Sequence, residues 1–94
     1  MEWNQPQIER IRKMESYFDM LTEVLKLCES TSGLDEEQNG MLKELLAYYD
    51  GGEWMSDFRA DEDGLIPQTL KRGILSEDTL YDFFTEYVWN PTLR

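Results

Sequence analysis

Histidine is absent from the 94-residue sequence, and cysteine occurs once, as Cys28. Without histidine the chain lacks the usual general base, the commonest metal ligand and the residue that activates nucleophiles in catalytic triads. One cysteine cannot form an internal disulfide, and it cannot build a thiolate zinc site alone. These absences exclude most catalytic and metal-binding classes, and the cysteine content fits a reducing compartment.

Long hydrophobic runs are also missing. The N-terminal stretch MEWNQPQIER has neither the basic region nor the apolar region of a signal peptide. No later stretch approaches the roughly 20 apolar residues of a transmembrane helix. We therefore expect a cytoplasmic protein that does not contact a membrane.

Basic residues are scarce, with 9 lysines and arginines against 20 acids and a net charge of -11. The negative charge is concentrated in residues 34–64, which carry ten acids and two bases. Such a field repels nucleic-acid phosphates and anionic lipids and attracts basic surfaces. The expected partner is a protein with a basic surface or a second copy of the chain, without direct nucleic-acid binding.

The first expected helix begins near Pro6, which suits a first helical position. Its apolar residues recur at steps of three and four, as in an amphipathic helix. The opposite face, which includes Glu15, is predicted to be solvated, and Cys28 is interpreted as a small core residue. The predicted core positions are Ile8, Ile11, Met14, Phe18, Leu21, Leu25 and Cys28, widened by Tyr17 and Val24.

A second helix is expected from about Asp35 to Gly51, after turn residues at 30–33. Gly40 within it is interpreted as the mark of a close helix crossing. The two helices predict an antiparallel hairpin with unequal arms, so the C-terminal helix or a second copy should cover Ile8 and Ile11. Its apolar face comprises Met41, Leu42, Leu45, Leu46 and Tyr49.

The second half predicts shorter elements. Glu53 to Glu62 should form a short helix that stacks Trp54 on Phe58 and stops at Gly64. Pro67 should open one turn over residues 68–72, closed by Gly73, before an extended link at 74–75. A last helix should run from 77 to about 89, with a cap at Ser76 and a stop at Pro91.

These elements predict an all-α fold, because no stretch alternates as a strand would. We expect a single helical domain over residues 1–94. Its parts are a long antiparallel helical hairpin, a short helix, an irregular Gly/Pro connector and a C-terminal helix, arranged as a small bundle.

Residues 61–66 imitate the middle of a calcium-binding EF-hand loop. Aligning Gly64 with the sixth loop position places Arg59 and Leu70 where carboxylate ligands are needed, so no calcium site is expected. Phosphate-binding, dinucleotide-binding and zinc-protease motifs are absent. The sequence thus predicts no catalytic residue, cofactor or metal, although Asp57 and Asp61 share a helical face that could do acid and base work.

Asp61, Glu62 and Asp63 lie at the C-terminal end of the short helix, where the helix dipole disfavours negative charge. They either pair with basic residues of the same chain, which we favour, or face a basic partner. Tryptophans carry the same ambiguity: burial is expected for Trp54, whereas Trp3 and Trp89 near the chain ends are interface candidates. The candidate interaction or structural-tie surface comprises Trp54, Asp57, Arg59, Asp61, Glu62, Asp63, Lys71, Arg72 and Trp89.

Two groups of residues carry a resemblance to a known family. In the first helix they are Arg10-Ile11 and Met14-Glu15. The more specific group comprises Trp54, Asp57, Ala60-Asp61-Glu62, Gly64, Pro67, Leu70-Lys71-Arg72-Gly73, Leu75-Ser76-Glu77-Asp78 and Leu80-Tyr81-Asp82. With these residues the chain resembles a bacterial family catalogued as domain of unknown function 4298. The resemblance implies a cytosolic helical protein of about this size and transfers no functional residue.

Three functions therefore compete. The leading hypothesis is a non-enzymatic, acidic protein-interaction module. The alternative is an inhibitor of a basic protein that mimics nucleic acid, as phage or host-defence proteins do. The second alternative is a carboxylate-dependent enzyme, which requires a pocket with convergent acids.

Overall fold

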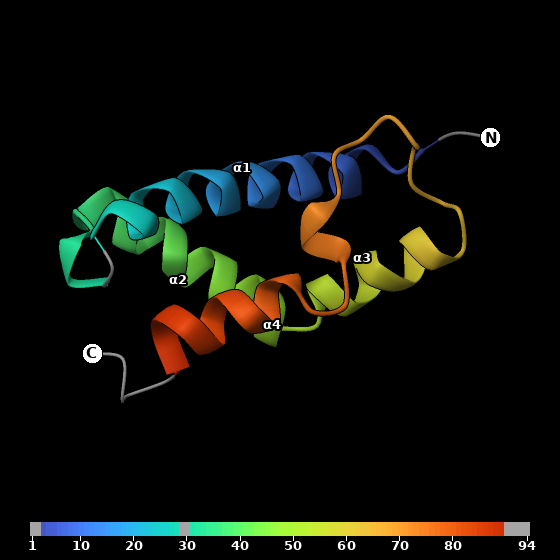
Figure 1. The fold of residues 1–94 in the computed structure, drawn as a ribbon. Coiled ribbons are helices and arrows are strands. Elements are labelled where there is room, and N and C mark those ends of the chain that lie inside the picture. Colours follow the sequence, from blue (N-terminus) through green and yellow to red (C-terminus); the bar gives the residue numbers. More distant parts are fainter. Residues whose placement is uncertain (1–2, 29–30, 90–94) are drawn as a thin grey trace.

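The computed structural model describes residues 3–28 and 31–89, and this part of the chain is helical without any strand. Figure 1 shows the α-helices α1 to α4, with a long irregular connector between α3 and α4. The predicted all-α fold is confirmed. Its elements are α1 (Gln5–Cys28), a 3-10 turn η1 (Thr31–Gly33), α2 (Glu36–Asp50), α3 (Glu53–Glu62), a 3-10 turn η2 (Gly73–Leu75), α4 (Thr79–Phe84) and a π-helical turn η3 (Thr85–Trp89).

Helix α1 begins where Asn4 caps it, because the Gln7 backbone N–H donates to Asn4 Oδ1 at 3.0 Å. The predicted apolar stripe is largely the buried one, and Phe18, Tyr17 and Val24 pack partly buried against it. The fully buried apolar members are Ile8, Ile11, Met14, Leu21 and Leu25.

Two expectations for α1 are wrong. Cys28 is exposed rather than part of the core, because it lies at the last turn of α1 beyond the packed stripe. Glu15 is buried rather than solvated. Glu15 follows Ile11 by four residues and precedes Phe18 by three, so it occupies a position on the core-facing stripe.

Helix α2 has a capping box, in which Asp35 accepts from the backbone of Gln38 and the Gln38 side chain accepts from the backbone of Asp35. The buried residues on its inner face are Leu42, Leu45 and Tyr48, with Met41, Leu46 and Tyr49 partly buried beside them. Tyr48 was not predicted as a core residue. The turn expected at 30–33 is seen as η1, except that Ser30 lies outside the described residues.

Gly40 does not mark a close helix crossing. It is exposed, and a Cβ atom added there would meet no atom within 4 Å. Its lack of a side chain is therefore unrelated to packing, and that expectation is wrong.

Helices α2 and α3 together form one bent arm that runs antiparallel to α1 (Figure 1). The bend lies at Gly52, whose φ of 95° is in the left-handed region that glycine tolerates. Asp57 of α3 bonds to Gln7 and Arg10, so α3 lies beside the first turns of α1. The expectation that the C-terminal helix or a second copy covers Ile8 and Ile11 is thus wrong, because both are buried at the end of α1 that α3 lies against.

Helix α3 has the predicted bounds and ends in a Schellman motif. The Leu65 N–H donates to the Ala60 carbonyl at 2.8 Å, and the Gly64 N–H donates to the Asp61 carbonyl at 3.1 Å. Gly64 has a φ of 74°, as this motif requires. The predicted stop is therefore confirmed.

The connector differs from its prediction in three places. The turn after α3 spans Pro67 to Leu70 instead of residues 68–72, and it is closed by a bond from the Leu70 N–H to the Pro67 carbonyl. Residues 73–75 form a 3-10 turn instead of an extended link. Helix α4 starts at Thr79 rather than Glu77, and no side-chain bond caps it. The turn at residues 73–75 follows from side-chain bonds to Ile74, described below.

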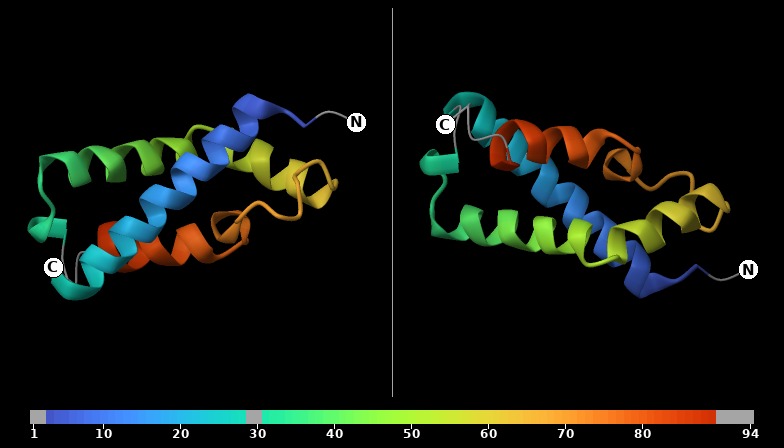
Figure 2. Two further views of the ribbon diagram at one scale, coloured as in Figure 1. Left: turned by 90° about the horizontal axis from the view of Figure 1, so that it is seen from above. Right: turned by 90° about the horizontal axis from the view of Figure 1, so that it is seen from below.

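Helix α4 returns along the α2–α3 arm, and Figure 2 shows α1 lying obliquely across the layer that these helices form. An edge-to-face contact of Phe83 with Phe18, with ring centroids 5.2 Å apart, joins α4 to α1. Phe84 contacts Tyr49 of α2 at 5.6 Å. The helical segment reaches Trp89, the last described residue, so the stop expected at Pro91 lies outside the described residues.

Two glycines allow a matched test of this geometry. Neither Gly40 nor Gly64 has an atom within 4 Å of an added Cβ, but only Gly64 has a positive φ. We expect Gly40→Ala to raise the free energy of unfolding by up to about 1 kcal/mol, through helix propensity. Gly64→Ala should lower it by about 1 kcal/mol, through the strain of a left-handed conformation. Urea denaturation measures both, and equal signs would contradict the assigned backbone geometry.

Candidate functional site

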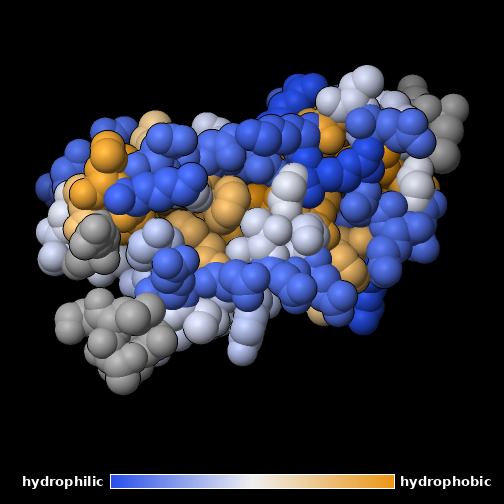
Figure 3. Space-filling model, viewed as in Figure 1, coloured by the Kyte–Doolittle hydropathy of each residue, from blue (hydrophilic) through white to orange (hydrophobic). Residues whose placement is uncertain are grey.

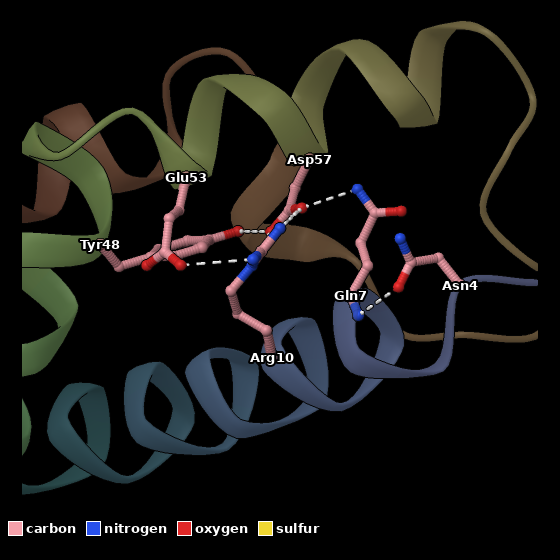
Figure 4. A network of polar contacts seen from close by, with 6 residues as sticks. All are labelled: Asn4, Gln7, Arg10, Tyr48, Glu53 and Asp57. Carbon is pink, nitrogen blue, oxygen red and sulfur yellow. Dashed lines mark hydrogen bonds and ion pairs between the residues drawn. The ribbon is translucent and has the colours of Figure 1, made fainter.

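The most extensive buried polar network centres on the Asp57 carboxylate in α3, which is fully buried. Figure 4 shows Arg10 and Tyr48 converging on it from α1 and α2. Arg10 donates from Nε to Oδ2 at 3.1 Å and from Nη2 to Oδ1 at 2.5 Å, a two-pronged contact. The Tyr48 hydroxyl donates to Oδ2 at 2.6 Å, and Gln7 Nε2 donates to Oδ1 at 2.9 Å. One carboxylate thus links three helices.

The network leaves Asp57 little capacity for chemistry. Each of its oxygens accepts two hydrogen bonds, and a carboxylate has about four acceptor sites. The hydrogen bond to Asp57 is the main cause that raises the pKa of Arg10 above its ordinary value. Burial, followed by the hydrogen bond to Asp57, raises the pKa of Tyr48 well above its ordinary value. Arg10 therefore stays charged and Tyr48 stays neutral at neutral pH, which suits a structural role.

A groove of about 460 Å³ opens beside this network, between the first half of α1 and the end of α2. It is lined by Pro6, Glu9, Arg10, Lys13, Met14, Glu44, Ala47, Tyr48 and Glu53. Both cations in it are paired: Arg10 lies 3.3 Å from Glu53 as well as bonding Asp57, and Lys13 lies 3.2 Å from Glu44. Among these lining residues, Glu9 alone of the acids has no ion pair.

A second set of buried bonds fixes the connector. The Ile74 N–H donates to Glu15 Oε1 of α1 at 3.0 Å, and the Ile74 carbonyl accepts from Trp54 Nε1 of α3 at 2.7 Å. Ile74 is fully buried, so both of its backbone groups are satisfied by side chains from two different helices. This explains why residues 73–75 form a tight turn rather than an extended link. Trp54 is buried as expected, stacked on Phe58 with centroids 5.1 Å apart.

Two ion pairs hold the connector just before Ile74. Lys71 Nζ bonds Asp19 of α1, and Arg72 Nη1 bonds Asp61 of α3. Asp61 is therefore tied internally, as favoured from the sequence, whereas Asp57 is tied by residues that the sequence reasoning did not associate with it. Glu62, Asp63 and Arg59 are exposed and form no ion pair among the described residues. Trp89 is exposed at the end of η3.

The sequence reasoning missed Gln7, Arg10, Glu15, Asp19 and Tyr48. A signal existed for two of them, because Glu15 and Tyr48 fall on the apolar stripes of their helices. A polar residue on such a stripe must find a buried partner. No local pattern marks Gln7, Arg10 or Asp19, whose partners lie about fifty residues away in the chain.

The described residues contain no group of three or more acids and cysteines that could hold a metal ion. Within residues 3–28 and 31–89, every helix is too short or too polar to span a bilayer.

The Asp57 network generates a stability prediction. Asp57→Asn should lower the free energy of unfolding by about 3 kcal/mol, because Arg10 loses its buried charge partner and keeps only the exposed carboxylate of Glu53. Glu44→Gln is the matched control: its pair with Lys13 is half exposed, and the change should cost under about 1 kcal/mol. Urea denaturation of the two variants measures the difference, and equal losses would contradict a central role for Asp57.

The raised pKa of Tyr48 predicts a pH effect. In the unfolded chain Tyr48 ionises around its ordinary value of 10.0, whereas in the folded protein it stays protonated to higher pH. Its contribution to stability is therefore complete below pH 10 and is lost as pH rises above that value. Tyr48→Phe should make the alkaline loss of stability shallower than in the wild type, measured by denaturation between pH 8 and 11. Tyr81→Phe, at an exposed ring, is the control, and an unchanged slope in Tyr48→Phe would contradict the prediction.

Comparison with known proteins adds one match. The family model described as Domain of unknown function (DUF4298) matches residues 11–89, which contain α2 to η3 and most of α1. No curated protein and no solved structure matches the chain. The matched region includes all residues of the two sets of buried bonds except Gln7 and Arg10, which precede it. On this match, the chain belongs to the DUF4298 family.

Proposed function

We propose that the protein is a non-enzymatic interaction module of the bacterial cytoplasm, which binds a partner protein through a basic surface on that partner. The observation that carries this proposal is the unequal use of the two kinds of charge. Half of the basic side chains in the described residues serve to hold the fold together, whereas most of the acids face solvent without an ion pair.

The paired basic residues are Arg10, Lys13, Lys71 and Arg72. Each of them joins two elements of the fold, so none is spare for an acidic ligand without weakening a tie. The exposed acids without an ion pair in the described residues include Glu36, Glu37, Asp50, Glu62, Asp63, Glu77, Asp78, Asp82 and Glu86. Among the described side chains that form no ion pair, acids therefore outnumber bases by a larger ratio than they do in the whole sequence.

The segment from η2 to η3 carries negative charge only. No lysine or arginine occurs between Gly73 and Trp89, whereas Glu77, Asp78 and Asp82 are exposed there. Figure 3 shows hydrophilic residues over most of the face that α1 and α4 share, with hydrophobic residues in a band between them. An unbalanced acidic surface raises the association rate with a basic partner and disfavours acidic ones.

The spread of the acids favours a basic protein partner over nucleic-acid mimicry. The unpaired acids occur in the first turn of α2, at the end of α3 and along α4, instead of in one row. A mimic of nucleic acid needs regularly spaced negative charge along one surface. Mimicry is therefore the alternative that the experiment below distinguishes.

Catalysis has weaker support. The groove beside Asp57 does hold three acids, but hydrogen bonds from Tyr17 and Lys13 lower the pKa of Glu44, its acid nearest Lys13. A general acid at neutral pH needs a raised pKa. Glu53 is likewise paired, with Arg10. The groove therefore supplies charge pairs rather than a poised acid and base.

Affinity capture from bacterial lysate tests the proposal. The immobilised wild-type chain should recover basic proteins at 50 mM salt, with recovery falling at least tenfold by 500 mM salt because the contact is electrostatic. A variant with Glu77→Gln, Asp78→Asn, Asp82→Asn and Glu86→Gln should recover several-fold less.

Three results would count against the proposal. The first is no specific recovery, the second is recovery of acidic proteins, and the third is recovery that the variant retains in full. Circular dichroism of the variant controls for folding. If added DNA displaces the recovered protein, the result favours the mimic instead.

A further inference from the structure

Three aromatic rings gather on the surface where α4 and η3 meet the end of α2. Trp89 is 40% exposed and Tyr81 is 53% exposed, and their ring centroids lie 6.0 Å apart. Tyr49 of α2 is half-buried and lies 6.2 Å from Trp89. We call Tyr49, Tyr81 and Trp89 the aromatic surface. It continues inward to the buried ring of Phe84, 5.3 Å from Trp89, so the fold holds it in place.

The π-helical turn η3 creates this surface. In a regular α-helix, residues eight apart are offset by about 80° around the axis, which would turn Trp89 away from Tyr81. A π turn accommodates about one extra residue, so Trp89 behaves as if it were seven residues from Tyr81 and lies above it. Helix widening of this kind is rare and often accompanies functional sites.

Acids flank the aromatic surface along the chain. Asp50 directly follows Tyr49 at the end of α2. In agreement with this placement, burial and after it the negative charges of Asp50 and Asp78, together with Tyr81, raise the pKa of Tyr49. Asp78 is the N-cap residue of α4 and lies about one turn before Tyr81, and Asp82 directly follows Tyr81 in the helix. All three acids are exposed and lack an ion pair in the described part of the chain.

Exposed rings beside unpaired carboxylates have a defined complement, namely a cation with a flat face. The faces of tryptophan and tyrosine attract cations, tryptophan most strongly. An arginine guanidinium is planar and weakly hydrated, so it stacks on a ring while it donates to a carboxylate, which a lysine ammonium cannot do as well. The arrangement of the aromatic surface and its acids fits an arginine side chain.

We propose that the aromatic surface, with Asp50, Asp78 and Asp82, is the contact for an arginine-bearing segment of a partner protein. This inference rests on the proposed function, because it names where the basic partner binds and which residue type it presents. The guanidinium stacks on Trp89 and Tyr81 and donates hydrogen bonds to the carboxylates at the rim.

A peptide titration tests the inference with the full-length protein. The probe is a nine-residue, end-capped peptide of five arginines separated by glycines, and the comparison peptide has lysine in place of arginine. At 150 mM salt, fluorescence anisotropy should show at least fivefold tighter binding of the arginine peptide. Equal affinities would overturn the inference, because a general acidic field does not distinguish the two cations.

Two tryptophans provide a matched pair of variants. Trp89→Ala should weaken binding of the arginine peptide at least tenfold, whereas Trp3→Ala should leave it unchanged. Trp3 is 39% exposed, nearly the same as Trp89, but it precedes α1, whose first turns lie at the opposite end of the molecule from the end of α4 (Figure 1). Tyr81→Ala is the second variant, because its ring is more than half exposed and its loss leaves the core intact; at least a threefold loss is expected. Wild-type affinity in both Trp89→Ala and Tyr81→Ala would overturn the inference.

A charge-matched pair separates the aromatic surface from the field of the whole protein. Asp50→Asn with Asp78→Asn should weaken binding severalfold more than Glu36→Gln with Glu37→Gln, since each pair removes the same charge. Equal losses would overturn the inference while leaving the proposed function standing. Failure of the proposed function is separate: the wild type would then bind neither peptide and recover no basic protein from lysate.

The aromatic surface could instead bind a second copy of the chain, and this alternative has its own test. Sedimentation velocity of the wild type at 10–100 µM should show a monomer. A dimer that Trp89→Ala dissociates would overturn the inference in favour of self-association.

Discussion

The structure depends on burying one carboxylate with all of its acceptor sites satisfied. Asp57 has no contact with solvent, and its partners come from α1 and α2 while it belongs to α3. An unpaired charge in that position is strongly destabilising, so the three helices are bound to one relative arrangement. Hydrophobic burial alone tolerates many packings. The paired carboxylate and the fork of Arg10 select one, because their hydrogen bonds are directional.

The connector follows the same logic on a smaller scale. A segment with little regular structure must find partners for its own backbone groups, and the Ile74 N–H and carbonyl find them in Glu15 and Trp54. The pairs Lys71–Asp19 and Arg72–Asp61 hold the residues just before it. Helix α4 is therefore docked through side chains of α1 and α3 as well as through its own apolar face.

The sequence predicted the helices well, because the spacing of apolar residues and the capping residues are local signals. Helix α3 has the expected bounds and the stop at Gly64, and the core stripe of α1 is largely as expected. The partners of buried polar groups were not predictable in the same way. Periodicity tells which face of a helix is buried but not which distant residue meets Arg10 or Glu15. The wrong interpretation of Gly40 has the same cause, since only the packed structure shows that nothing lies near it. The acids of α3 could likewise be separated into internally paired and unpaired ones only from the structure, which shows that Asp57 and Asp61 are paired while Glu62 is not.

The π-helical turn changes which residues share a side of the helix. Phe84 and Trp89 are five residues apart in sequence, yet their ring centroids lie 5.3 Å apart on one side of the helix, as rings four residues apart can in a regular helix. A relative with one residue fewer between these positions would present the same ring from an ordinary α-helix. A relative that lacks one residue between these two positions would therefore keep the aromatic surface. A relative of the same length whose tryptophan is moved by one position would place that ring on another side of the helix.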